Sequence, residues 1–283
     1  MKLGYLVVAV VIVSALAFLY YTYASPRASV GGGIVVAVSI APQADFVKHV
    51  AGDRAEVVVM VPPNADPHTY EPTPSQLEKV SEAKIYFMVG SGVEFELAWM
   101  DKLTDLNPSM LLVNGSEGID LLEGDPHVWL SPKNAKVMVL NFYKGLVKVD
   151  PAHEGEYKEN LDRYLKELDS LDAYICDKLS GCKDRVFLVY HPAFGYFARD
   201  YNLTQLSVER EGKPPSPATI EGCVELAKEH NISYVFVEPQ FPTKTAEVIA
   251  NEIGGKIGWL DPMPEDYVSG MMLIADRLAE ELG

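Results

Sequence analysis

The sequence predicts an α/β protein with two lobes, each a mainly parallel sheet flanked by helices. Three features predict this class: strand and helix candidates alternate from Ile34 onward, the alternation restarts after Gly181, and one long helical pattern separates the two blocks. Alternation of this kind is typical of a parallel sheet covered on both faces. A chain of 283 residues also has room for two lobes, because one domain commonly takes about 100 to 200 residues.

Residues 1–24 form an apolar N-terminal segment. Lys2 is its one charged residue, and the uncharged run that follows, Leu3–Ala24, is long enough to span a bilayer. The pattern also fits a secretory signal, although about 22 residues is long for a signal core. We expect an uncleaved membrane anchor, with residues 25–33 as a flexible glycine-containing tether. The rest of the chain would then lie on the extracytoplasmic face of the cell membrane, anchored or secreted.

The first block, residues 34–150, alternates strands and helices. Its strand candidates are short apolar runs that suit buried parallel strands: Ile34–Ile40, Glu56–Val61, Ile85–Val89 and Met110–Val113. Its helix candidates have apolar residues at helical spacing: Ala44–Gly52, a stretch from Pro74, Glu94–Leu103 and Pro132–Lys148. Thr73 and Ser131 can cap the two helices that begin at prolines, and Gln76 completes a capping box with Thr73.

Residues 151–182 contain the longest helix candidate. From Glu154 to Leu179 the chain has no Pro, no Gly after Gly155, and apolar residues at helical spacing. At about 1.5 Å per residue such a helix would be about 40 Å long, enough to pass along both lobes. The periodicity alone also fits an ordinary amphipathic surface helix.

The second block, residues 183–283, repeats the rhythm of the first. Its strand candidates are again short apolar runs: Val186–Tyr190, Thr204–Val208, Tyr234–Val237 and Lys256–Leu260. Its helix candidates are the stretch from Phe194 to Asp200, one from Pro217 capped by Ser216, Thr243–Ile253 and Asp266–Glu281. This block therefore predicts a second parallel sheet.

The charge balance excludes one class of partner. The chain has 24 Lys and Arg against 40 Asp and Glu, a formal net charge of −16. Nucleic acid requires a basic surface, which this composition does not readily provide. An acidic protein attracts cations, but many soluble acidic proteins bind none, so the charge alone is weak evidence for a metal.

Three histidines follow predicted strands or precede predicted helices. His68 and His127 each end an Asp-Pro-His triplet, and His191 directly follows the strand that ends at Tyr190. Asp261 directly follows another strand of the same block. Because ligands of open α/β sheets lie outside the carboxyl ends of the strands, all four side chains can face one cleft.

Three imidazoles and one carboxylate predict a zinc site. This nitrogen-rich set suits Zn²⁺, whereas Mn²⁺, which stays possible, usually prefers more oxygen ligands. We interpret Asp66 and Asp125 either as partners that orient an imidazole or as plain turn formers. The other histidines, His49, His153 and His230, lie in or beside charged helices and are expected to be solvated.

The cysteines leave the disulfide state open. Cys176, Cys182 and Cys223 would permit one disulfide outside the cell, and Cys176 with Cys182 is the pair nearer in sequence. Connectivity does not follow from spacing, and one thiol is left over.

Several motifs together resemble one known family. They are Asn64-Ala-Asp-Pro-His-Thr-Tyr-Glu-Pro-Thr-Pro, Gly90-Ser-Gly-Val-Glu-Phe-Glu, Asp125-Pro-His-Val-Trp-Leu-Ser-Pro, Tyr190-His-Pro-Ala-Phe-Gly-Tyr-Phe, Glu238-Pro-Gln-Phe and Leu260-Asp-Pro-Met. In this order they resemble the extracytoplasmic solute-binding proteins of zinc and manganese ABC transporters, the zinc-uptake branch in particular. The resemblance covers nearly the whole chain after Gly33.

The resemblance implies a fold, a site and a function. It implies two α/β lobes joined by one long rigid helix, with metal bound between them by His68, His127, His191 and Asp261. It also implies a monomer that captures a divalent metal, delivers it to a membrane permease and catalyses no reaction. One departure is that 114–124 is short and without histidine, where many zinc-uptake members carry a His-rich acidic loop.

Two other classes of function compete with this interpretation. A zinc hydrolase would use three protein ligands and a reactive water, but the chain has no His-Glu-x-x-His motif, and a fourth ligand at Asp261 would close the position that the water needs. An adhesin or sensor would use the metal only to stabilise its fold. Such a protein should unfold on chelation, whereas a transport receptor should stay folded.

Overall fold

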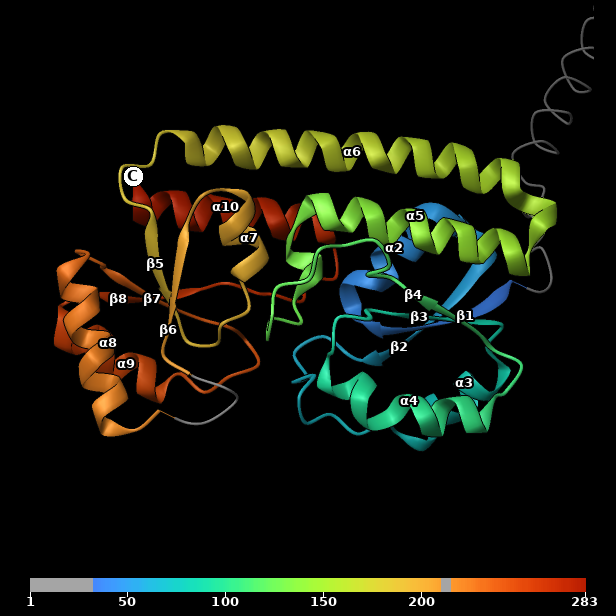
Figure 1. Ribbon diagram of the computed structural model, residues 1–283, viewed down its shortest axis with the longest axis horizontal. Helices are drawn as coiled ribbons and strands as arrows, with labels where there is room; N and C mark the ends of the chain where they lie inside the picture. The colour runs from blue at the N-terminus through green and yellow to red at the C-terminus, as the bar shows by residue number, and fades with distance from the viewer. Residues whose placement is uncertain (1–32, 210–214) are drawn as a thin grey trace, which may run out of the picture. The chain divides into compact units, whose positions relative to one another are not determined.

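The computed structural model describes residues 33–209 and 215–283. Residues 1–24, expected to be an anchor, and nearly all of the expected tether lie outside the described residues. Ile34–Gly283 form one unit, whose elements are labelled in Figure 1. Within residues 33–209 and 215–283, no helix is long and apolar enough to cross a membrane.

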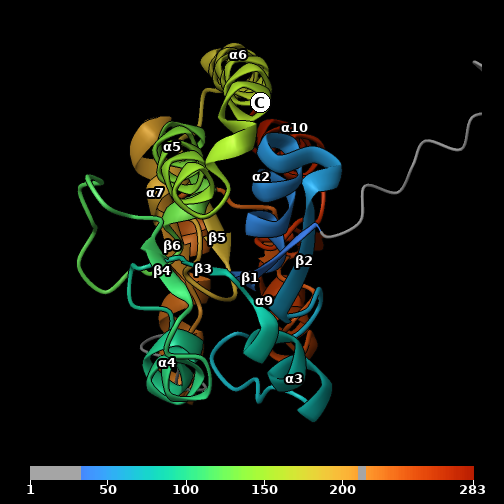
Figure 2. The same ribbon diagram turned by 90° about the vertical axis from the view of Figure 1, so that its right-hand side faces the viewer.

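The first sheet has the strand order β2-β1-β3-β4, with every pair parallel. Its strands are β1 (Ile34–Ile40), β2 (Ala55–Val61), β3 (Ile85–Met88) and β4 (Leu111–Asn114). The helices around it are α2 (Ala41–Ala51), α3 (Pro74–Glu82), α4 (Glu94–Leu106) and α5 (Pro132–Val149). Figures 1 and 2 show α2 and α5 on one side of this sheet and α3 and α4 on the other. Both faces are therefore covered, as apolar parallel strands require.

The second sheet repeats this arrangement with the order β6-β5-β7-β8, again all parallel. Its strands are β5 (Val186–Val189), β6 (Thr204–Ser207), β7 (Tyr234–Val237) and β8 (Lys256–Trp259). Its helices are α7 (Gly195–Asp200), α8 (Pro217–Glu229), α9 (Lys244–Ile253) and α10 (Tyr267–Leu282). The predicted α/β class with two mainly parallel sheets is confirmed.

One long helix, α6 (Glu154–Ser180), packs against elements of both blocks. It contacts α2 and α5 of the first block and α10 of the second, and it runs above them in Figure 1. Its buried stripe extends along the whole helix: Tyr157, Leu161, Tyr164, Leu168, Leu171, Ile175 and Leu179. Because these contacts join the blocks in one unit, the boundaries at 34–150, 151–182 and 183–283 stay predictions.

Most element boundaries match the sequence pattern, and the exceptions have physical reasons. The capping box of α3 is present, with the Thr73 N–H donating to Gln76 Oε1 at 2.9 Å. Helix α2 begins at Ala41, three residues before the predicted start, because Gln43 inside the helix accepts from the N–H groups of Ser39 and Ile40. No disulfide joins Cys176 to Cys182.

The two sheets position their carboxyl edges for ligand binding. In each sheet the chain runs from a central strand to one neighbour and then crosses to the other side, so the strand order reverses beside β1 and beside β5. Ligands of open α/β sheets bind outside the carboxyl ends of strands at such points. The segments after β2, β5 and β8, which contain the predicted metal ligands His68, His191 and Asp261, leave from these edges.

Candidate metal centre

His68 lies in the segment between β2 and α3. Its backbone N–H donates to Asp66 Oδ1 at 2.9 Å, which closes a turn around the histidine. Gln76 of α3 donates from Nε2 to the carbonyls of Val59 and Met60 at 2.8 and 2.7 Å. The strand and the helix on either side of His68 are therefore held together.

His127 lies in a second copy of the same turn, ahead of α5. Its N–H donates to Asp125 Oδ1 at 2.9 Å, and its ring Nδ1 lies 2.8 Å from the same oxygen. Ser131 caps α5 immediately afterwards. Asp125 thus closes the turn and orients the imidazole, whereas the hydrogen bond that Asp66 makes to His68 is to the backbone only. Of the two roles considered for these aspartates, Asp66 is therefore a turn former and Asp125 also orients an imidazole.

His191 follows Tyr190 at the carboxyl end of β5. Its N–H donates to both carboxylate oxygens of Glu238 at 3.2 Å, and its ring stacks on Phe241 with 4.7 Å between centroids. Its Nδ1 lies 3.0 Å from Glu209 Oε2. Glu209 follows β6 and Glu238 follows β7, so the three neighbouring strands of the second sheet together fix the orientation of His191.

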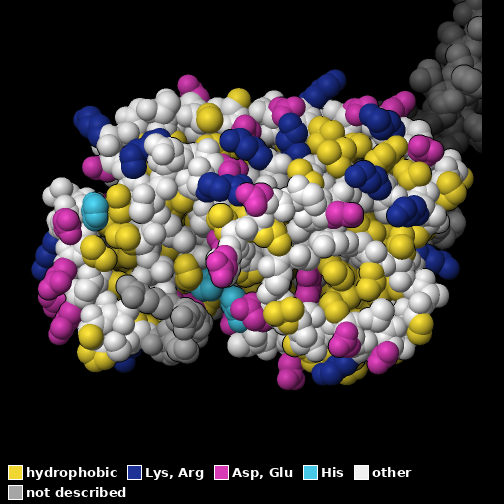
Figure 3. Space-filling model, in the orientation of Figure 1, with side chains coloured by type: hydrophobic (Ala, Val, Ile, Leu, Met, Phe, Trp, Pro, Cys, Tyr) yellow, Lys and Arg dark blue, Asp and Glu magenta, His cyan; other side chains and the backbone are white. Residues whose placement is uncertain are grey.

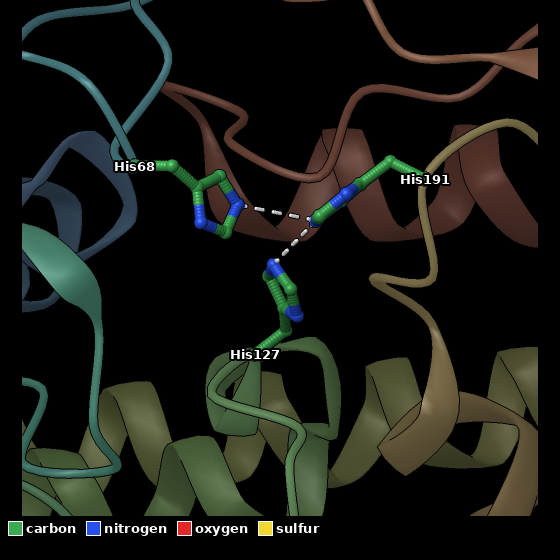
Figure 4. Close-up of side chains that lie close together, drawn as sticks. All are labelled: His68, His127 and His191. Atoms are coloured by element: carbon green, nitrogen blue, oxygen red, sulfur yellow. Dashed lines mark hydrogen bonds between the residues drawn. The ribbon is translucent and has the colours of Figure 1, made fainter. Parts of the chain in front are cut away.

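The three imidazoles converge on one point through their Nε2 atoms (Figure 4). His191 Nε2 lies 3.3 Å from that of His68 and 3.2 Å from that of His127. One ligand atom from each of the three residues lies within 4.8 Å of the others, and within the described ranges no other such group of His, Cys, Asp and Glu occurs. Tetrahedral zinc with Zn–N of about 2.0–2.1 Å places its nitrogens about 3.3–3.4 Å apart. Both distances from His191 Nε2 fit that geometry.

Each of these imidazoles has a carboxylate at its other ring nitrogen. His68 Nδ1 lies 2.8 Å from Glu94 Oε2. The corresponding carboxylate is Asp125 for His127 and Glu209 for His191. Carboxylates at this position commonly orient metal-binding histidines and make them more basic. When each Nδ1–H donates to its carboxylate, the three Nε2 lone pairs face one another, and a cation between them would satisfy all three.

Glu94 and Glu209 were not among the site residues predicted from the sequence. Both lie just after a strand end, Glu94 at the start of α4 after β3 and Glu209 after β6. The strand-end rule that selected the histidines applies equally to them. Their role depends on which imidazole lies opposite, which spacing along the chain does not reveal.

Burial and neighbouring carboxylates act in opposite directions on two histidine pKa values. For His127, burial is the largest influence and lowers the pKa, despite the hydrogen bond and charge of Asp125. For His68, burial is again the largest single influence, but the hydrogen bond and charges of Glu94 and its neighbours together raise the pKa. His127 is therefore neutral at neutral pH, the form that binds metal.

Asp261 directly follows Leu260 at the end of β8 but lies outside the histidine group. Its Oδ1 accepts from the Met263 N–H at 2.9 Å and from Gln240 Nε2 at 3.2 Å. Asp261-Pro262-Met263 is thus a third Asp-Pro turn of the type found at His68 and His127, with methionine in place of histidine. The structure brings three of the four predicted ligands together, and Asp261 as the fourth stays a prediction.

The space beside the histidines is small and apolar. A cavity of about 10 Å³ is lined by Pro67, His68, His127, Trp129, His191, Gln240, Phe241, Pro262 and Met263. Figure 3 shows histidine side chains in a hollow of the surface, with acidic side chains near them. His127 and His191 are 4% and 5% exposed, whereas the side chain of His68 is 22% exposed. A volume near that of one water molecule suits a single cation.

The remaining histidines lie outside this centre, and the prediction that they are solvated is met fully by His49 alone, because His153 and His230 are partly buried. His49 of α2 is partly exposed and stacks on Tyr164, with 4.0 Å between ring centroids. His153 pairs with Asp150 ahead of α6, and His230 follows α8. None of the three belongs to the converging group.

Nearly all of the described chain is similar to known zinc-uptake proteins. Residues 36–281 match the family model described as ZnuA, zinc-uptake complex component A periplasmic. The high-affinity zinc uptake system protein ZnuA of Bacillus subtilis is 30% identical over 249 residues, which cover 81% of this chain and 78% of the relative. The matched range 36–281 includes nearly all of both sheets and all four predicted ligands.

Two crystal structures of ZnuA are similar to this chain over most of its length. The first is 41% identical, covers 89% of this chain and 100% of its own, and superposes with a TM-score of 0.86. The second, a deletion mutant with zinc bound, is 40% identical, covers 89% and 98%, and has a TM-score of 0.84.

Proposed function

This chain belongs to the ZnuA family of zinc-uptake components, and from that premise we propose that it is the solute-binding component of a metal ABC transporter. It captures a divalent metal, zinc, outside the cell membrane and delivers it to a membrane permease. The observation that carries the proposal is the convergence of three Nε2 atoms, each on an imidazole with a carboxylate at Nδ1.

Zinc is the cargo that the donor set favours. Imidazole nitrogens suit the borderline-soft Zn²⁺ better than the harder Mn²⁺, which prefers oxygen. The zinc-bound ZnuA structure, 40% identical to this chain, supports the same choice. Mn²⁺ remains the competing metal that an experiment has to compare.

Asp261 is our candidate for the fourth ligand. Like His191, it follows the carboxyl end of a strand of the second sheet. Among the described residues its Oδ2 has no hydrogen bond. Since it lies outside the group in this structure, binding requires a local movement that brings Oδ2 toward the three Nε2 atoms.

The size of the cavity favours a binding protein over an enzyme. A hydrolase with three histidines and a reactive water needs space for its substrate, and small-molecule sites commonly measure about 300–1,000 Å³. The cavity among the three histidines measures about 10 Å³, and the neighbouring open pocket that His68 also lines, at about 260 Å³, is still below that range. The cavity among the histidines suits a bare cation, so we propose that the protein catalyses no reaction.

The cellular arrangement completes the proposal. We propose that residues 1–24 anchor the chain to the membrane, that residues 25–33 act as a tether, and that the monomer presents its metal to the permease on the extracytoplasmic side. The family description, which names a periplasmic component, supports this location.

A competition between zinc and manganese tests the cargo. The full-length protein, purified in detergent and stripped of metal, is titrated with each metal against a chromophoric chelator, and bound metal is counted by mass spectrometry. We expect one equivalent of zinc, displaced by manganese only at large excess. Tighter manganese binding would overturn the assignment of the cargo, and failure to bind either metal would overturn the proposed function.

A further inference from the structure

The segment Glu238–Phe241, which follows β7, contacts both His191 and Asp261. Glu238 accepts the backbone N–H of His191, and Phe241 stacks on its ring. Between them, Gln240 donates from Nε2 to Asp261 Oδ1 at 3.2 Å. One short segment therefore links the third histidine to the aspartate that is the candidate fourth ligand.

The side chain of Gln240 has a buried oxygen that accepts no hydrogen bond. Among the described residues, its Oε1 is the only buried side-chain nitrogen or oxygen without a hydrogen-bond partner. Buried polar groups are nearly always paired, and an exception needs a physical reason. Gln240 also borders the cavity beside the three histidines, so the exception lies at the site itself.

Asp261 supplies that reason. Turning the Gln240 amide over would place Oε1 against Asp261 Oδ1, acceptor against acceptor, and would lose the bond from Nε2. The side chain instead keeps its donor on the carboxylate and leaves Oε1 without a donor. The orientation of Gln240 is thus determined by Asp261 rather than by its own hydrogen-bonding needs.

The third Asp-Pro turn differs from the other two in this contact. In each turn the aspartate Oδ1 accepts the N–H two residues later, at 2.9 Å for Asp66, Asp125 and Asp261 alike. Of these three aspartates, and among the contacts of the described residues, only Asp261 also accepts at Oδ1 from a side-chain amide, that of Gln240. Two donors on Oδ1 fix the plane of the carboxylate and leave Oδ2 as its available oxygen.

We propose that Gln240 is a positioning residue for the cargo metal. Its Nε2 holds Asp261 so that Oδ2, and not Oδ1, is the oxygen available to the cation held by the histidines. Gln240 itself does not touch the metal and acts only through Asp261. This inference rests on the proposed function, because it assumes that the histidine centre binds zinc.

Gln240→Leu tests the inference in two backgrounds. In the wild type, we expect zinc affinity to fall about 10–100-fold, the usual effect of removing a group that orients a metal ligand. In Asp261→Ala, the same substitution should produce no further loss, because its target is gone. Wild-type affinity for Gln240→Leu, or an equal loss in both backgrounds, would overturn the role of Gln240.

A spectroscopic readout separates positioning from general destabilisation. The visible absorption of Co²⁺-loaded Gln240→Leu should shift from the wild-type spectrum toward that of Co²⁺-loaded Asp261→Ala, since the carboxylate is no longer held with Oδ2 toward the metal; a wild-type spectrum would contradict the proposal. Gln205→Leu is the matched control: it removes the bond from Phe194 N–H to Gln205 Oε1, 2.6 Å long, without touching Asp261. It should keep wild-type zinc affinity and the wild-type Co²⁺ spectrum.

Two further comparisons keep the outcome interpretable. Thermal unfolding of the metal-free variants shows whether each is folded, and Gln240→Met, which keeps the length of the side chain, replaces Gln240→Leu if that variant does not fold. If the wild type binds no zinc, the proposed function fails. If the wild type binds zinc and both Gln240 variants bind it equally well, only the inference about Gln240 fails.

Discussion

Replacing His191 by alanine is expected to lower zinc affinity by more than about 100-fold, beyond the effect of losing a group that only orients a ligand. Its Nε2 lies within 3.3 Å of both other Nε2 atoms, so it occupies the middle of the donor set. Without it, two histidines remain to bind the cation. The substitution also leaves the buried Glu209 without its imidazole partner, which should lower the free energy of unfolding by about 1–3 kcal/mol.

His230→Ala is the matched control for this variant. His230 belongs to the same block, follows α8 and lies outside the converging group, so its removal should change zinc affinity little. Both affinities are measured by chelator competition, and thermal unfolding of the metal-free proteins confirms that both variants are folded. A single zinc bound by His191→Ala as tightly as by the wild type would contradict the placement of the site.

Lowering the pH is expected to weaken zinc binding strongly. The metal binds neutral imidazole, so a proton on any of the three histidines has to leave before zinc can bind. The pKa of His68 is raised above its ordinary value of 6.5, since Glu94 and its neighbours outweigh the lowering effect of burial. Below that raised pKa, the displaced proton alone should cost about tenfold in apparent affinity for each pH unit.

The stability of the metal-free protein depends on pH in the opposite direction at His68, increasing as the pH falls. Because the pKa of His68 is raised on folding, its pairing with Glu94 contributes stability that is fully present below 6.5 and is lost as the pH rises through the raised pKa. Acid therefore favours the metal-free protein at this residue and promotes release. Removing the negative charge with Glu94→Gln should move the onset of weakening to lower pH.

Zinc competition from about pH 8 to pH 5.5 measures this dependence. The wild type should lose affinity steadily over the range, with protons released on binding, and Glu94→Gln should hold its own affinity to a lower pH. A wild-type affinity independent of pH over this range would mean that histidines are not the ligands.

The histidine centre was predictable because strand ends are visible in the sequence. The two Asp-Pro-His triplets and Tyr190-His191 each stand beside a predicted strand or helix, and parallel strands bring their carboxyl ends to one edge. What could not be predicted is which carboxylate meets which imidazole. Glu94 reaches His68 from α4, a pairing that depends on how α4 packs and not on any spacing along the chain.

Local capping rules explain where the element predictions succeeded and where they did not. Thr73-Pro74 with Gln76 is a complete start signal, and α3 begins at Pro74. Helix α2 has no such signal, because Ile40 occupies its N-cap and the glutamine that satisfies the free N–H groups lies inside the helix. The long pattern of α6 predicted its buried stripe, but not that α10 would cover part of it.

The most direct test of the central claim, that three imidazoles hold one zinc ion, is X-ray absorption at the zinc edge of the protein loaded with one equivalent. We expect three imidazole nitrogens at about 2.0–2.1 Å, with the multiple scattering typical of histidine, and one oxygen ligand. Sulfur neighbours at about 2.3 Å, or fewer than three imidazoles, would contradict it.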